Sequence, residues 1–122
     1  MAHNIVYLPE ESLVEVTFIG HVTAEDRIAV LDAISPNVRA MGIRNLLVDF
    51  SAAWHETLDT FDMAMLSSRL EREPDYKRGC RIAFVSLPET HSIASERRAA
   101  ELGFQTRRFY AKDKARAWLS EQ

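Results

Sequence analysis

Hydrophobic and polar positions follow two different periods along the chain, and the order of these periods predicts an α/β fold. Two short runs rich in Val, Ile, Phe and Tyr open the chain, at residues 4–8 and 13–19, and predict a β-hairpin. Residues 46–50 and 80–87 are almost continuously apolar, which is typical of strands covered on both faces. Residues 106–110 predict a last strand.

Stretches with helical spacing separate these strands. The sequence Thr23-Ala24-Glu25-Asp26 resembles a capping box, and the apolar residues behind it predict one buried face: Ile28, Leu31, Ile34, Val38 and Met41. Pro36 predicts a kink in this helix. Similar patterns predict helices over about 57–71 and 88–102. Asp113 is expected to cap a final helix whose Ala115, Trp118 and Leu119 share a face.

The resulting order is strand, strand, helix, strand, helix, strand, helix, strand, helix. Alternation of this kind builds a mostly parallel sheet, because each right-handed crossover places its helix on a face of the sheet. We therefore expect a mixed sheet of about five strands flanked by about four helices. The length of 122 residues and the lack of a linker-like segment predict one domain over residues 1–122.

Composition narrows the class of protein. The chain is 47% hydrophobic and 27% charged, which is typical of a globular domain, and no apolar run is long enough to cross a membrane. The formal net charge of -3 gives no general attraction to nucleic acid. The single cysteine, Cys80, excludes an internal disulfide, and the first four residues lack the start of an export signal. These features predict a cytoplasmic protein.

The order of elements resembles the STAS fold, and more specifically the SpoIIAA-like group, also described as STAS/lipid-transfer-like. The segments that carry the resemblance extend over nearly the whole chain and are 18–26, 45–51, 81–85, Phe109 and 115–119. The resemblance implies a bacterial, non-enzymatic domain that binds a protein partner or a small ligand and needs no cofactor. One departure concerns the Asp-Ser-Ser-Gly-like turn that holds the phosphorylated serine of anti-sigma-factor antagonists. This chain reads Ser51-Ala52-Ala53-Trp54-His55-Glu56-Thr57 there, so that phosphorylation site does not carry over.

Candidate binding residues follow the two central strands. Ligands of open α/β sheets collect outside the carboxyl ends of the parallel strands, which nominates Asp49, Ser51, Trp54, His55, Ser86 and Arg97. Asp49 is also suited to a structural role, in which its carboxylate accepts hydrogen bonds from the loop that follows. Met63 belongs to a predicted second helix with more apolar residues than one buried stripe needs, and it is a candidate for a partner surface.

These residues leave several functions open. The first is association, either with a second copy of the chain or with another protein, through the second helix and the loop before it. The second is transport of a small apolar or acidic ligand in a pocket between helices. The third hypothesis is a hydrolase with Ser51 or Ser86 as nucleophile, although no Gly-x-Ser-x-Gly sequence supports it. No spacing of histidines and acids typical of a metal site is present.

Overall fold

In the computed structural model, a single five-stranded sheet organises the part of the chain that can be described: residues 2–54, 64, 68–69, 80–86, 100–101 and 103–121. The strands are β1 (Ala2–Leu8), β2 (Leu13–His21), β3 (Asn45–Trp54), β4 (Arg81–Val85) and β5 (Gln105–Phe109). Between β1 and β2 lies a short 3-10 helix, η1 (Pro9–Glu11). The two longer helices are α1 (Ala24–Met41) and α4 (Lys112–Leu119).

The strand order is β1-β2-β3-β4-β5. β1 pairs antiparallel with β2, and all other neighbours are parallel, so the predicted hairpin and parallel sheet are confirmed. Within the apolar runs at 46–50 and 80–87, residues 46–49 pair in parallel with residues 82–85, as the composition of these runs predicted. The predicted helices over 57–71 and 88–102 fall mostly outside the described residues, so two helices, α1 and α4, support the layered α/β arrangement.

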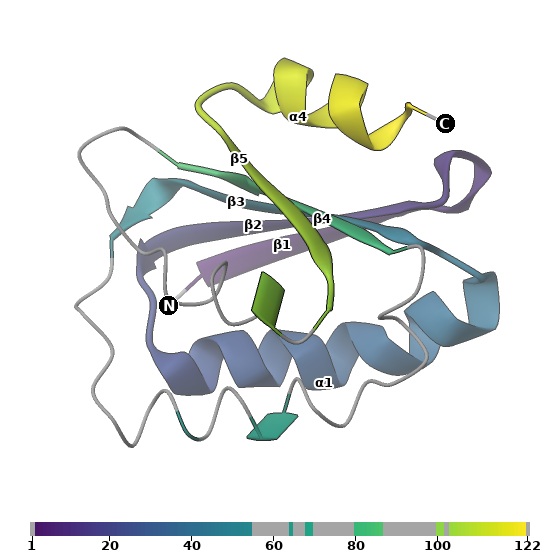
Figure 1. Cartoon of the computed structure of the whole chain (residues 1–122). Helices are drawn as coiled ribbons and strands as arrows, with labels where there is room; N and C mark the ends of the chain where they lie inside the picture. Colours follow the sequence, from purple (N-terminus) through teal and green to yellow (C-terminus); the bar gives the residue numbers. More distant parts are fainter. Residues whose placement is uncertain are drawn as a thin grey trace.

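Two hydrophobic clusters lie on opposite faces of the sheet, and Figure 1 shows α1 below the sheet and α4 above it. The cluster on the α1 side joins residues of β2, β3 and β4 to Val30, Ile34 and Val38. The smaller cluster on the α4 side joins Leu47, Ala83 and Val85 to Ala115 and Leu119. This division follows from the period of two along each strand, which sends alternate side chains to opposite faces.

The α1 helix begins and ends as its sequence predicts, but it buries a different stripe. The Thr23 hydroxyl accepts a hydrogen bond from the Asp26 N–H, and the Asp26 carboxylate accepts one from the Thr23 N–H. Gly42 adopts a left-handed φ of 66° and ends the helix. The helix continues through Pro36, and its buried residues are Ala24, Arg27, Val30, Ile34, Ser35 and Val38.

The predicted stripe was therefore only partly right, since Ile28 and Leu31 are half-buried and Met41 is exposed. The reason is that Arg27 and Ser35 occupy buried positions that a count of apolar residues does not find. The predicted cap of the last helix was also wrong. Ala111 is the N-cap of α4, and Asp113 lies within its first turn. Neither described helix combines the length and the apolar character needed to span a membrane.

Candidate functional site

Asp49 and Ser51 lie within β3, where the strand contains a β-bulge. Thr17 pairs with Asp49 and Ile19 pairs with Ala52, so β3 has one more residue than β2 over this stretch. The Asp49 Oδ1 accepts hydrogen bonds from the Ser51 N–H at 2.8 Å and from the Ser51 hydroxyl at 2.6 Å. Asp49 is 6% exposed. Its carboxylate therefore stabilises the bulge, in agreement with the structural role that its sequence position suggested.

Trp54 was expected after the strand predicted at 46–50, but it is the last residue of β3. The bulge shifts the register, and β3 then continues along β2 as far as the pair His21 and Trp54. The two rings stack with centroids 4.2 Å apart, while Trp54 remains 54% exposed. This extension was not predicted because Ser51, Ala52 and Ala53 are not typical strand residues.

Ser86 comes directly after β4 and is 6% exposed. Its N–H donates to the carbonyl oxygen of Phe109 at 3.0 Å, but its hydroxyl has no hydrogen-bond partner among the residues that the structure describes. The other predicted site residues, His55, Met63 and Arg97, lie outside the described residues.

The geometry of the described residues does not support the hypothesis that the chain is a hydrolase. The Ser51 hydroxyl donates directly to the Asp49 carboxylate, whereas a catalytic triad places an imidazole between such groups. Within the described part of the chain, no three His, Cys, Asp or Glu side chains are grouped as a metal site would need.

Arg27 is a buried polar residue that the sequence analysis missed. It belongs to the first turns of α1 and is 5% exposed, and its guanidinium carbon lies 5.1 Å from the centroid of the Phe50 ring. Burial disfavours the charged form and lowers the pKa of Arg27 to about 10, so the side chain remains protonated at neutral pH. Helical spacing from Ala24 to Val30 was the available signal, but an arginine at such a position is usually read as a surface residue.

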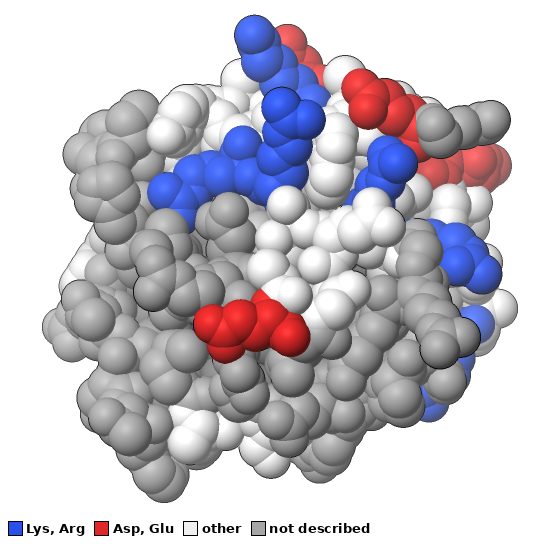
Figure 2. Space-filling view, viewed as in Figure 1, with Lys and Arg blue, Asp and Glu red and all other residues white. Residues whose placement is uncertain are grey.

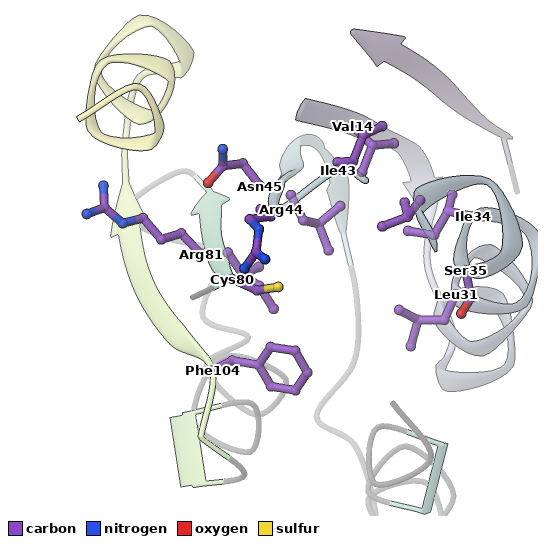
Figure 3. A pocket seen from close by; sticks show the side chains of 13 residues that line it. Val14, Leu31, Ile34, Ser35, Ile43, Arg44, Asn45, Cys80, Arg81 and Phe104 are labelled. Atoms are coloured by element: carbon purple, nitrogen blue, oxygen red, sulfur yellow. The ribbon is translucent and has the colours of Figure 1, made fainter. Parts of the chain in front are cut away.

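A small apolar cavity opens at the opposite end of the sheet, near the amino ends of β3 and β4. It has a volume of about 70 Å³. Figure 3 shows Leu31, Ile34 and Ser35 of α1 facing Cys80 and Phe104 across it, with Arg44 beside Cys80. The Arg81 side chain turns away from the cavity, because its guanidinium donates to the carbonyl oxygens of Trp118 and Glu121.

Cys80 contributes the only sulfur to this cavity among the described residues. Burial raises the pKa of its thiol, and the positive charge of Arg44 opposes that change in part. The thiol is therefore protonated at neutral pH and is a weak nucleophile. Its contribution to the cavity is apolar surface.

Basic side chains gather over β5 and α4, at the top of the molecule in Figure 2. Most of those with described contacts interact within the domain. Arg116 and Lys112 form ion pairs with the buried Glu15, and Arg107 lies over the Phe109 ring at 5.4 Å. This arrangement favours structural roles for these charges over a surface for nucleic acid.

The half of the sheet beyond α4 carries a surface that we call the open face. α4 packs mainly on β3, β4 and β5. Alternation along the strands places on the same side, beyond this helix, Asn4, Val6, Thr17, Ile19, His21, Ala52 and Trp54. Val6 and Ile19 are 46% and 42% exposed, and the set itself contains no Asp, Glu, Lys or Arg. Two acids on the same side of the sheet, Glu15 beside Val6 and Asp49 beside Thr17, are buried.

The fold is similar to that of a solved structure from Shewanella loihica PV-4, an uncharacterized protein from the DUF3478 family with a SpoIIAA-like fold. The TM-score is 0.62, and the match covers 97% of this chain and 92% of the Shewanella chain at 21% sequence identity. No protein-family model and no curated protein matches the chain. The comparison confirms the predicted SpoIIAA-like fold, and at this identity it shows the fold alone.

Proposed function

We propose that this chain is a non-catalytic binding domain that acts by protein association, and that a second copy of the chain is its partner. The observation that carries the proposal is the edge strand β1, which has neither a charged residue nor a proline over Ala2–Leu8. An edge strand with these properties is a template for another strand, because one row of its backbone groups points away from the sheet.

The opposite edge of the sheet is protected. β5 carries Arg107 and Arg108, and charged residues on an edge strand discourage pairing with a second sheet. β1 is therefore the edge on which a second copy fits best. Two β1 strands related by a two-fold axis would pair antiparallel, which is the self-complementary arrangement that a symmetric dimer requires.

The open face supports the same partner. Each copy carries a formal net charge of -3, so two copies repel one another in most relative orientations. Pairing of the two β1 strands would bring the uncharged open faces next to each other. Val6 would lie beside the new strand pair, where its exposed side chain can be covered by the second copy.

Light scattering coupled to size-exclusion chromatography tests the proposal. We expect a dimer for the wild type and a monomer for Val6→Lys, because the substitution adds a charge where the two copies meet. Gln105→Lys is the matched control, since it places the same charge at an exposed position on the other edge strand, and it should remain a dimer. A monomeric wild type across the accessible concentration range would overturn the proposal, as would dissociation by both lysines alike.

A second candidate function is the binding of a small apolar ligand, and the cavity near Cys80 favours it. Its volume of about 70 Å³ is below the roughly 150 Å³ of an apolar cavity known to hold benzene. The cavity therefore suits a small apolar molecule or the tip of a larger one, and a lipid-like ligand would need more space.

Xenon is a suitable probe for this cavity, because it binds apolar cavities without any polar contact. We expect xenon to shift the NMR signals of Ile34 and Phe104 in a saturable manner, and Ile34→Phe to abolish these shifts by filling the space. Val30→Phe is the matched control, since it overpacks the same core one helical turn away without lining the cavity. If xenon leaves these signals unchanged in the wild type, the cavity has no ligand-binding role.

A further inference from the structure

A buried cation and a buried hydroxyl lie at the carboxyl end of the sheet, on the face that α1 covers. Phe84 belongs to the cluster on the α1 side and Val85 to the cluster on the other side, so alternation turns Ser86 toward α1. Asp49 pairs with Val85, and Phe50 and Ser86 are the next residues along these two parallel strands. The Arg27 guanidinium lies over the Phe50 ring. Phe50 therefore lies beneath the Arg27 guanidinium and on the strand next to Ser86.

We propose that Arg27 and Ser86 form a binding site for a small oxyanion, a carboxylate or phosphate group, at the carboxyl ends of β3 and β4. This site is separate from the β1 edge and from the apolar cavity. It lies where ligands of parallel α/β sheets usually bind, in the region outside the carboxyl ends of the strands.

The hydroxyl of Ser86 is the first argument for a ligand. It is more than nine-tenths buried, and no atom in the described part of the chain forms a hydrogen bond with it, although burying a hydroxyl without a partner is unfavourable. An oxyanion would accept a hydrogen bond from this hydroxyl. The neighbouring Ser86 N–H is already used by the carbonyl oxygen of Phe109, so the side chain is the group that a ligand would meet.

The charge of Arg27 is the second argument. The whole Arg27 residue is only 5% exposed, and an anion beside a buried cation gains more Coulomb energy than it would in water. Five N–H donors in a planar fork match the geometry of carboxylate and phosphate oxygens. The Phe50 ring fixes the position of the guanidinium, because this ring is itself stacked on the Phe18 ring, with centroids 5.2 Å apart.

The position of Arg27 in α1 adds to the positive potential. The helix begins at Ala24, so Arg27 lies in its first turns, where the helix dipole is positive. A cation is normally unfavourable there, whereas an anion that binds between this end of the helix and Ser86 is favoured by both the dipole and the guanidinium.

The experiment titrates the protein with acetate and with inorganic phosphate at constant ionic strength, with chloride as the comparison anion. Binding is followed by thermal unfolding and by the NMR signals of the Arg27 side chain and the Ser86 amide. We expect saturable stabilisation by acetate, by phosphate or by both, and none by chloride. The better of the two oxyanions identifies the group that the site prefers. If neither oxyanion acts differently from chloride, the proposal is overturned.

Ser86→Ala gives the sharpest test, because it separates binding from folding. Removal of a buried hydroxyl that has no partner should leave the stability of the anion-free protein unchanged or raised. The same substitution should weaken oxyanion binding by about tenfold, the effect of one lost hydrogen bond. Equal affinity in Ser86→Ala and in the wild type would remove Ser86 from the site and overturn the proposal.

Arg27→Met is expected to abolish the response to oxyanions, and Arg27→Lys, which keeps the charge but loses the planar fork, to weaken it. Arg107→Met is the matched control. Arg107 also lies over a phenylalanine ring, at 5.4 Å, but on the exposed surface of β5, and its loss should leave oxyanion binding unchanged. An equal loss of affinity in Arg27→Met and Arg107→Met would show general charge screening in place of a site.

Discussion

Replacement of Asp49 tests whether this buried carboxylate stabilises the bulge in β3 or takes part in function. Asp49→Ala removes the acceptor of two hydrogen bonds from Ser51, one from the backbone N–H and one from the hydroxyl. Asp49→Asn keeps a carbonyl oxygen at the same place and removes only the charge. If the acceptor is what matters, the asparagine variant should remain close to the wild type.

The magnitude follows from these two bonds. A hydrogen bond to a charged acceptor contributes about 1.5–3 kcal/mol, and the half-buried Ser51 can replace part of this with water. We therefore expect Asp49→Ala to lower the free energy of unfolding by about 2 kcal/mol, and Asp49→Asn by less than about 1 kcal/mol. For 122 residues at roughly 2.1 cal/mol/K each, 2 kcal/mol corresponds to a decrease in Tm of about 8 °C.

Urea unfolding and calorimetry at neutral pH measure these differences, with Ser51→Ala as the control that removes only the hydroxyl bond. We expect the order of stability to be wild type, Asp49→Asn, Ser51→Ala and Asp49→Ala, with the first three close together. An asparagine variant as unstable as the alanine variant would refute the reasoning, because the charge and not the acceptor would then be the important property. A fully stable Asp49→Ala would show that the bulge does not need its side chain.

Three further predictions concern contacts at the helices. Thr23→Ala should lower the free energy of unfolding by about 1 kcal/mol in urea unfolding, because it breaks the capping box of α1, whereas Thr23→Ser should be nearly neutral. Arg116→Met should change how the free energy of unfolding depends on pH under acidic conditions. The hydrogen bond from Arg116 is the main cause that lowers the pKa of Glu15, so the stability it contributes is present above the ordinary glutamate pKa and is lost as the pH falls through the lowered one. Unfolding measured against pH should therefore be flatter on the acid side for the variant, and an unchanged profile would contradict this origin. Arg81→Met should lower the protection of the α4 amides in hydrogen exchange, since it removes donors to two carbonyl oxygens at the end of that helix, and equal protection would contradict the role.

The strands and their order were predictable because the period of the apolar residues reports directly on burial. Leu47 and Ala83, on strands with continuous apolar runs, are fully buried, and parallel pairing of these strands followed from the helices expected between them. The acceptor role of the Asp49 carboxylate was expected, but for a loop, and the sequence does not indicate that the strand resumes after a bulge at Ser51. The longer β3, and with it the position of Trp54, was missed for the same reason.

The candidate site was predictable only in part. The rule for parallel sheets correctly drew attention to Ser86, but the sequence cannot show whether a hydroxyl has a partner. Arg27 was missed because charged residues are read as exposed, although its stem and planar head pack well against an aromatic ring. The apolar cavity has no local signature at all. Its wall combines α1 with the starts of β3 and β4 and with Phe104, which are far apart along the chain.

The three proposed features divide between the two faces of the sheet in a way that makes them separable. The oxyanion site and the apolar cavity both involve α1, with Arg27 near its start and Val38 near its end, about 16 Å apart at 1.5 Å per residue. A ligand at either place therefore acts on the same helix, and its effect on the other site depends on how α1 packs against the sheet. Self-association instead uses the backbone edge of β1 and the open face, which lies on the side of the sheet opposite α1, although Ile5 and Tyr7 of β1 pack against the cluster on the α1 side. A substitution such as Ser86→Ala should consequently change anion binding without changing the dimer, and Val6→Lys should do the reverse. A variant that altered both anion binding and dimer formation would indicate that the oxyanion site and the β1 edge are coupled through β2 and β3, the strands that lie between them.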